Sequence, residues 1–378
     1  MTRLTLVNAY LMSTSGAIIY LIAPVLIGTV MDSLAIDADQ AGLLLAAYFA
    51  GYTLITTSAV FWLGRVNMRS AAWLSSLVFV VALLAGAAQT SLNAIYASLS
   101  FAGVGAGMLY GISITIIGQS DAPDKHFGIA LAAQLVLGSA LLFAGPAVIG
   151  PQFGFAGILI ATAAFVALLS VTSHWTPTHA IKSHQTNDHA PIAGRAVLLG
   201  LIALLLWFTG YSGIYAFVER IGVTGGLSGH EIGLILSLTI ITGVAGAMGA
   251  AWLGNRMGHL APHWLGALGT ALTIVLLSND PGLVRFSLAI VALTLSLNFW
   301  LAYMLGSVSK LDISGRYSVL TTAALGAGAT IGPAIAGLIL QRADMLQVLM
   351  AAGLLILAGF SGITMALKRS ADSLAASN

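Results

Sequence analysis

The chain has 378 residues, of which 58% are hydrophobic and only 7% are charged, and its formal net charge is +2 at pH 7. A water-soluble domain carries about 25% charged residues, so this composition excludes a soluble protein, and the small net charge argues against a nucleic-acid partner. Without cysteine, the chain has neither disulfides nor thiolate metal sites. An integral membrane protein remains.

Twelve segments are long and apolar enough to cross a bilayer, which takes roughly 20 mostly apolar residues. Backbone groups inside lipid must be hydrogen-bonded internally, so each segment is expected to be a helix. The first is too long, and its basic start too weak, for a cleaved signal peptide, so it is expected to be a retained span. The segments lie near residues 8–31, 41–63, 70–89, 93–118, 127–149, 154–173, 196–218, 231–253, 261–278, 284–306, 317–340 and 345–367.

The distribution of basic residues predicts the orientation of these spans. With the N-terminus inside, eleven Lys and Arg fall on the cytoplasmic side, and only Arg220, Arg285 and Arg342 fall outside. Cytoplasmic loops of membrane proteins are enriched in basic residues. We therefore expect a multi-pass protein of the cell (inner) membrane with both termini in the cytoplasm.

Three short sequences recur in the same order, which indicates two related halves. WLGRVNMR is echoed by WLGNRMGH 190 residues later, DQAGLLL by HEIGLIL after 191, and GPAVIG by GPAIAG after 187. Repeats of this kind place a substrate site between the halves, near the bilayer midplane. The predicted organisation is a six-helix half over 1–173, a cytoplasmic linker over 174–195 and a second six-helix half over 196–378.

The repeated basic loop resembles a motif of the major facilitator superfamily. In that family the loop between helices 2 and 3 typically reads G-x-x-x-D-R-x-G-R-R. Arg256 and Gly258 match this pattern, whereas Ala251, Asn255 and His259 depart from it. The first copy of the loop departs further.

Other segments strengthen the resemblance, which covers nearly the whole chain. FAGVGAG (101–107) is similar to the family's glycine-rich fourth helix. GPAVIG and WFTGYSGIYAFVERIG (207–222) resemble helices 5 and 7 of its drug:proton antiporters. The resemblance implies an all-α integral membrane fold of twelve helices in two pseudo-symmetric six-helix bundles, working by alternating access.

The basic loops are candidates for a conformational latch. Arginine at a helix end can bond the orphan carbonyls of neighbouring helices and interacts favourably with their dipoles. If such bonds exist in only one conformation, the loops hold that conformation closed. Alternatively, the arginines only keep the loops inside. The latch residues would be Arg65, Arg69, Asn255 and Arg256.

The two Gly-Pro elements are expected to bend helices that pack where the halves meet. Proline removes a hydrogen bond from a helix interior, and glycine lets neighbouring backbones approach closely. The residues concerned are Gly145, Pro146, Gly332 and Pro333.

The seventh span carries an aromatic face that ends in an acid. Trp207, Tyr211, Tyr215 and Glu219 recur every four residues, a spacing that drifts by only about 40° per step around a helix. Such a face suits an aromatic or cationic guest through stacking and cation–π contacts, although Trp and Tyr also form interfacial belts. Further residues expected to line the pathway are Tyr20, Tyr48, Tyr52, Tyr110, Gln134, Asn298 and Tyr303.

Acidic residues next to the membrane are scarce, and ionisable groups there are costly and usually functional. Glu219 is the first candidate for carrying a coupled proton, and Asp32 is the second. Arg220 is expected to point about 100° away on the helix and to leave Glu219 unneutralised. The alternative interpretation of Glu219 is a solvated residue at a helix end.

Two other patterns have simpler explanations. Ser228-x-x-Glu231 and Asp37-x-x-Gln40 have the spacing of capping boxes at helix starts. Four histidines recur every five residues in the linker, at 174, 179, 184 and 189. That step separates side chains by about 140° on a helix, so no metal site is expected.

The sequence therefore predicts a secondary transporter and not an enzyme, without a cofactor. The lack of a central Lys or Arg argues against anionic substrates. We expect a monomer in the lipid bilayer that exports a neutral or cationic, amphipathic or aromatic small molecule in exchange for protons. Alternatives are uptake or facilitated diffusion of a small neutral metabolite, and a non-transporting membrane sensor with a degenerate transporter fold.

Overall fold

The computed structural model describes residues 2–63, 65–120, 123–178, 194–253, 256, 261–311 and 320–377, and the regular elements among them are all helices. For residues 60, 123–125, 194, 251, 309–310 and 370–377 it describes the backbone alone. Asn255 and the linker histidines at 179, 184 and 189 lie outside the described residues.

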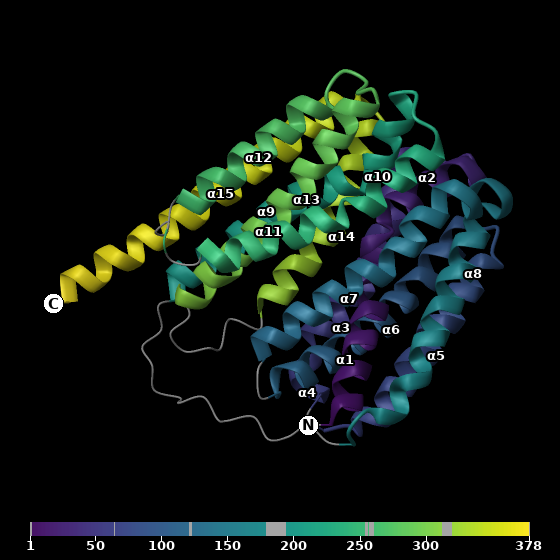
Figure 1. Cartoon of the computed structure of the whole chain (residues 1–378), viewed down its shortest axis with the longest axis horizontal. Helices are drawn as coiled ribbons and strands as arrows, with labels where there is room; N and C mark the ends of the chain where they lie inside the picture. Colours follow the sequence, from purple (N-terminus) through teal and green to yellow (C-terminus); the bar gives the residue numbers. More distant parts are fainter. Residues whose placement is uncertain are drawn as a thin grey trace. The chain divides into compact units, whose positions relative to one another are not determined.

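The N-terminal half of the sequence folds into eight α-helices and two short helices of other types (Figure 1). They are α1 (Arg3–Leu21), α2 (Ala23–Leu34), α3 (Ala38–Thr57), α4 (Ala59–Trp62), α5 (Met68–Ala87), α6 (Leu92–Gly118), α7 (Pro123–Ala144), the π-helix η1 (Gly145–Ile149), α8 (Gly150–Ser170) and the 3₁₀-helix η2 (Val171–Trp175).

The C-terminal half contains seven described α-helices. They are α9 (Gly194–Thr224), α10 (Gly229–Leu238), α11 (Ile240–Leu253), α12 (Ala261–Leu277), α13 (Leu283–Leu311), α14 (Leu320–Leu340) and α15 (Met345–Ser377).

These helices correspond to the twelve predicted spans. α1 with α2, α3 with α4, α7 with η1, and α10 with α11 each form one span. Among the described residues, nine stretches are long and apolar enough to cross a membrane, and one of them, His126–Trp175, covers two predicted spans. The two remaining spans are α3 and the 17-residue apolar helix α12. The predicted all-α membrane fold is confirmed.

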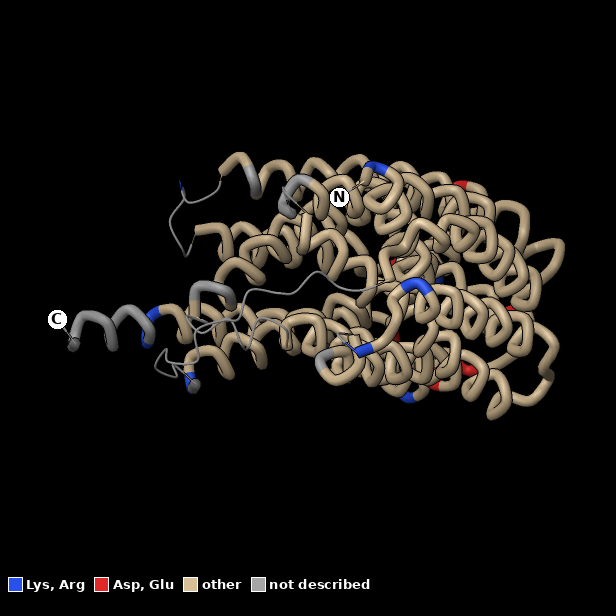
Figure 2. Tube along the Cα trace, turned by 90° about the horizontal axis from the view of Figure 1, so that it is seen from below, with Lys and Arg blue, Asp and Glu red and all other residues tan. Residues whose placement is uncertain are grey.

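The chain divides into two compact units close to the predicted halves. One comprises residues 1–184 and 229–237, and the other comprises 185–228 and 238–378. Most of α10 therefore belongs to the first unit, because Gly229 lies against Pro146 and Gly233 lies against Phe143. In both units the charged residues lie mostly near helix ends, with long uncharged stretches between them (Figure 2).

Glycines allow the central helix of the first unit, α6, to touch its neighbours backbone to backbone. A Cβ atom added at Gly103 would collide with the backbone carbonyl of Tyr48 on α3, and one added at Gly51 would collide with that of Ser100. The FAGVGAG segment is therefore a packing surface, as small residues are in many membrane helices.

In the second unit α9 is the central helix and packs on α13, α14 and α15. A Cβ at Gly210 would lie 2.6 Å from the carbonyl oxygen of Ala352, and one at Gly359 would lie 2.6 Å from that of Ala203. The aromatic face of α9 is thus held between helices at very short separation.

The first span is interrupted next to Tyr20. α1 ends at Leu21 and α2 begins at Ala23, because Pro24 has no N–H to donate to the carbonyl one turn earlier. The eighth span breaks similarly at Thr239, between α10 and α11. Transporter sites are commonly built where membrane helices are discontinuous.

Glycine in a conformation that other residues rarely adopt makes the turn between spans 5 and 6. Gly154 has φ +61°, and the next residue, Phe155, donates its backbone N–H to the Ser33 hydroxyl at 2.9 Å. The end of α2 therefore caps the start of the sixth span.

We predict that Gly103→Ala destabilises the first unit by about 1–3 kcal/mol, because the added methyl group forces α3 and α6 apart. The control is Gly111→Ala on the same helix, where nothing lies within 4 Å of the added Cβ and removal of a flexible glycine gains about 0.5–1 kcal/mol. Thermal unfolding of the detergent-solubilised protein measures both. Equal Tm values for the two variants would contradict this account of the α3–α6 contact.

Candidate substrate pathway

Four of the tyrosines predicted to line a pathway lie in one aromatic cluster of the first unit. Tyr20 comes from α1, Tyr48 and Tyr52 from α3, and Tyr110 from α6. The ring centroid of Tyr52 lies 6.5 Å from that of Tyr48 and 6.0 Å from that of Tyr110. Phe49 lies 5.0 Å from Tyr48 and 6.2 Å from Tyr20. We call these five residues the tyrosine cluster.

The polar groups of the tyrosine cluster are uncharged. A side-chain hydrogen bond joins Tyr110 to the predicted pathway residue Gln134 on α7. The Tyr48 side chain is fully buried, and its hydroxyl oxygen has no hydrogen-bond partner in the protein. A buried polar atom without a partner costs about 1–3 kcal/mol, so this hydroxyl is an uncommitted hydrogen-bonding group within the cluster.

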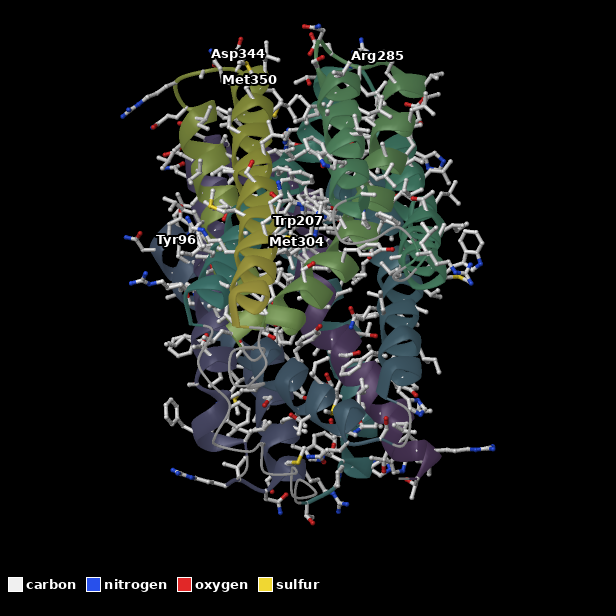
Figure 3. All side chains as sticks on the ribbon, turned by 90° about the vertical axis from the view of Figure 1, so that its left-hand side faces the viewer. Tyr96, Trp207, Arg285, Met304, Asp344 and Met350 are labelled. Atoms are coloured by element: carbon white, nitrogen blue, oxygen red, sulfur yellow. The ribbon has the colours of Figure 1, made fainter. Side chains whose placement is uncertain are left out.

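In the second unit, the rings of Trp207, Tyr211 and Tyr215 follow one another along α9. The centroids of Trp207 and Tyr211 lie 6.4 Å apart, and the stacked rings of Tyr211 and Tyr215 lie 5.9 Å apart. All three side chains are buried. Trp207 lies toward the middle of this unit, whereas Arg285 and Asp344 lie at one end (Figure 3), so an interfacial belt does not account for Trp207.

Glu219 follows this row of rings and forms an ion pair with its neighbour. Arg220 Nε lies 3.4 Å from Glu219 Oε2, and the two side chains are 16% and 10% exposed, respectively. The expectation that Arg220 leaves Glu219 unneutralised is wrong. The 100° separation applies to the Cβ directions, and the long arginine side chain folds back across it. Asp32 lies in the last turns of α2 and is exposed.

Asn298 and Tyr303 on α13 are partly buried and bonded to backbone carbonyls. Asn298 Nδ2 donates to the Thr294 carbonyl at 2.9 Å, one turn earlier on the same helix. The Tyr303 hydroxyl donates to the Ala250 carbonyl on α11 at 3.4 Å. These bonds fix the two side chains against α11 and α13.

The sequence did not predict a buried hydrogen bond between a histidine and a tryptophan. His263 on α12 and Trp300 on α13 are 0% and 1% exposed, and the Trp300 indole N–H donates to His263 Nδ1. The Trp300 ring meets Trp207 edge to face at 5.0 Å. The available signal was an isolated His within an apolar span, but 37 residues separate it from its partner.

The sequence matches the family described as Major Facilitator Superfamily over residues 9–307, which is most of the chain. The chain belongs to the Major Facilitator Superfamily. It is a multi-pass membrane transporter and not an enzyme, and it shares its fold with solved transporters of this type.

Two solved structures illustrate the shared fold. The crystal structure of the D323A mutant of the nucleoside transporter NupG is 14% identical in sequence and has a TM-score of 0.74. The match covers 96% of this chain and 100% of the NupG chain. A bacterial homologue of the human lysosomal transporter Spinster, in an inward-facing and unoccupied conformation, is 16% identical with a TM-score of 0.66. The match covers 97% of this chain and 95% of the homologue. No curated protein sequence matches the chain.

Within this family member, Arg69 binds its own half. Its Nε donates to the Thr176 carbonyl at 2.9 Å, and the backbone N–H of Met68 donates to the Thr178 carbonyl at 2.9 Å. Asn8 on α1 completes the arrangement by donating to the Thr176 hydroxyl at 2.9 Å and accepting from Thr172 at 3.0 Å. We call this set of bonds the α1–α5 staple, because it ties the segment after span 6 to both helices.

Arg65 and Arg256 of the basic loops are exposed, as Arg69 is. Arg65 follows α4, and its backbone N–H bonds the Trp62 carbonyl at 2.9 Å. The Arg256 guanidinium lies over the Trp252 ring, 5.7 Å from its centroid. A latch between the halves stays a prediction.

The two Gly-Pro elements have different neighbours. Gly145 faces Val25 on α2, and Pro146 lies against Gly229 on α10, a helix from the second half of the sequence. The helix is π-type here, over Gly145–Ile149. Gly332, which precedes Pro333 inside α14, instead faces Ser212 and Gly213 on α9. The first element thus contacts the opposite half of the sequence, and the second contacts its own.

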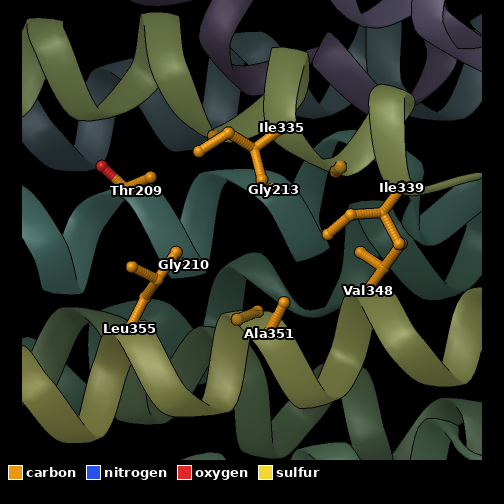
Figure 4. Close-up of a pocket in the computed structure, with 11 residues that line it drawn as sticks. Thr209, Gly210, Gly213, Ile335, Ile339, Val348, Ala351 and Leu355 are labelled. Carbon is orange, nitrogen blue, oxygen red and sulfur yellow. The ribbon is translucent and has the colours of Figure 1, made fainter.

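A small crevice opens beside Gly332 between α9, α14 and α15 (Figure 4). Its lining is apolar apart from Thr209, whose hydroxyl donates to the Leu205 carbonyl at 2.8 Å. The labelled walls include Gly210, Gly213, Ile335, Ile339, Ala351 and Leu355. The crevice offers no uncommitted polar group, so it is a packing feature of the Gly-Pro element.

We predict that Tyr48→Phe preserves or raises the Tm, because it removes a buried hydroxyl that has no protein partner. The control is Tyr96→Phe, which deletes a hydroxyl that donates to the Gln40 carbonyl at 3.0 Å and should cost about 1 kcal/mol. Thermal unfolding compares the two. A Tyr48→Phe variant as unstable as Tyr96→Phe would show that the Tyr48 hydroxyl has a structural role.

Arg69→Gln is predicted to destabilise the protein by about 1–2 kcal/mol, since the Thr176 carbonyl loses a charged donor. Arg65→Gln is the matched control and should change stability by less than about 0.5 kcal/mol, as expected for an exposed side chain. Protease cleavage after span 6 should accelerate in Arg69→Gln alone. Similar cleavage in both variants would rule out the α1–α5 staple as the restraint on this segment.

Proposed function

We propose that this transporter exports a small neutral or cationic molecule with an aromatic or amphipathic body, in exchange for protons. The observation that carries the proposal is the tyrosine cluster, in which tilted and edge-to-face rings surround a buried hydroxyl without a protein partner. Aromatic rings bind flat or cationic bodies by stacking and cation–π contacts. The Tyr48 hydroxyl supplies one hydrogen bond that a substrate can complete.

The charge of the interior supports the same substrate class. Among the residues whose side chains are described, Glu219 and His263 are the buried ones with an acidic or basic group, apart from tyrosines. An anionic substrate would need a fixed positive partner, and Arg220, the described Arg whose Nε is buried, is already paired with Glu219. A neutral or cationic substrate meets no such requirement.

Uptake or facilitated diffusion of a neutral metabolite is the second candidate, and the uncharged tyrosine cluster favours it. One structurally similar protein is titled a nucleoside transporter. A nucleoside combines a flat base with sugar hydroxyls, which rings, phenols and the Gln134 amide suit chemically.

For the export cycle, we assign the coupling proton to Glu219. A carboxylate at the end of an aromatic face attracts a cationic guest, and a proton on the same carboxylate neutralises it and removes this attraction. The ion pair with Arg220 adds a step, because protonation of Glu219 also releases Arg220. The basic-residue bias further leads us to propose a monomer of the inner membrane with both termini in the cytoplasm.

Transport into proteoliposomes tests the function. Ethidium serves as the cationic aromatic probe and uridine as the neutral one, each with and without an imposed pH gradient. Accumulation of ethidium that collapses with the gradient supports proton-coupled export. If uridine equilibrates at the same rate with and without the pH gradient, facilitated diffusion is supported instead. If neither probe is transported, the aromatic substrate class is contradicted.

Glu219→Gln is predicted to reduce gradient-driven ethidium accumulation about tenfold or more, because glutamine cannot carry the proton. Exchange of ethidium down its own gradient should stay within about twofold of the wild type. Asp32→Asn is the matched control, since Asp32 is exposed. Full accumulation by Glu219→Gln, or equal loss in both variants, would remove Glu219 from the coupling step.

A further inference from the structure

His263 is held in one protonation state by its two ring partners. Its side chain is 0% exposed, the Trp300 indole N–H points at Nδ1, and Nε2 lies 3.3 Å from the Ser307 hydroxyl. An indole nitrogen can only donate, so Nδ1 must accept and carries no proton. In a neutral imidazole the hydrogen is then on Nε2, which donates to Ser307.

Trp300 connects this histidine to the aromatic face of α9. Its indole lies directly on the α12 backbone, where a Cβ at Gly266 would be 2.8 Å from the ring. Phe360 of α15 lies 5.5 Å away on another side. The Trp300 ring meets Trp207 at 5.0 Å, and Trp207 leads to Tyr211 at 6.4 Å. A shift of Trp300 therefore changes the wall against which Trp207 rests.

We propose that His263 is a proton-sensing positioning residue, and that Trp300 transmits its protonation to the aromatic face of Trp207, Tyr211 and Tyr215. A proton added at Nδ1 places two donors, Nδ1–H and the indole N–H, face to face. Their hydrogen bond is lost, and Trp300 leaves its place against Trp207. The neutral and protonated forms of His263 thus present two different faces to an aromatic molecule.

The charged side chains described on the helices that pack against α12 are exposed. α13 and α15 are the helices that pack on α12. The charged side chains described on them are Arg285, Lys368 and Arg369, all exposed. On α9, which carries Trp207, Glu219 lies twelve residues further along, about 18 Å at helical rise, and Arg195 is exposed. His263 lies in the first turn of α12, two residues after its start.

The test follows the Trp300 indole N–H signal by ¹⁵N NMR on the full chain in lipid nanodiscs. Trp300→Phe identifies the signal by its loss. The inference predicts that this signal moves through a single transition as the pH is lowered from about 8 to 5 and His263 takes up its proton. In His263→Gln, whose amide oxygen still accepts a hydrogen bond, the signal should not titrate.

His126 provides a matched control in the other unit, where it bonds the Tyr10 hydroxyl. His126→Gln should leave the Trp300 titration unchanged. A wild-type Trp300 signal that stays fixed over this pH range overturns the proposal by itself, whether or not the variants fold. Titration that persists in His263→Gln overturns it as well.

A second measurement tests the functional consequence, which rests on the proposed aromatic substrate. Ethidium affinity, followed by its fluorescence, is expected to change about tenfold between pH 5.5 and 8 in the wild type and less than twofold in His263→Gln. The Trp300 titration needs neither substrate nor pH gradient. Failure to bind ethidium therefore counts against the proposed function, while a fixed Trp300 signal counts against the role of His263.

Discussion

A polar group inside a membrane has no water to bond with, and this constraint organises the interior of the protein. Serine and threonine hydroxyls satisfy this constraint by bonding to the backbone of their own helix. Thr14, Ser75 and Thr162, for example, each donate to a carbonyl one turn earlier on their own helix, at 2.9, 2.5 and 2.7 Å. Such bonds let apolar spans carry hydroxyls without breaking the helix. A side chain that departs from this pattern either bonds another group or leaves a buried polar atom without a protein partner.

Three departures fall at candidate functional residues. Tyr48 is buried with an unpartnered oxygen, and Trp300 finds its acceptor on another helix at His263. Glu219, the buried acid, pairs with the arginine next to it. Each is a polar group that local backbone bonding does not satisfy. Functional sites are where a fold is expected to break its own local rules.

The sequence was informative wherever one helix decides the outcome. Twelve apolar runs predict twelve spans because spanning depends on length and hydropathy alone, and four-residue spacing places Trp207, Tyr211 and Tyr215 along one helix. The Asp37–Gln40 capping box at the start of α3 is likewise local and is present. Helical periodicity is enough for such predictions.

Helical periodicity does not predict which residues of different helices come into contact. Tyr20, Tyr52 and Tyr110 could be named one by one, but their meeting depends on glycines that bring α3 and α6 together. The pairing of His263 with Trp300 depends in the same way on the contact at Gly266. The ion pair of Glu219 was missed for another reason, because helical angles describe Cβ directions and ignore the reach of arginine.

The repeated sequences also show how two related halves acquire different chemistry. The first basic loop contributes Arg69 to the α1–α5 staple, whereas in the second Arg256 lies over Trp252. The aromatic clusters differ in the same way. The cluster in the first unit contains uncharged tyrosine phenols and the Gln134 amide. The second unit combines tryptophan indoles with the buried Glu219 carboxyl and His263 imidazole. Groups that keep one charge state favour constant recognition, while groups that titrate make binding depend on protons. In the proposed cycle, the groups that bind and release protons therefore come from the second unit, and the groups of constant charge come from the first.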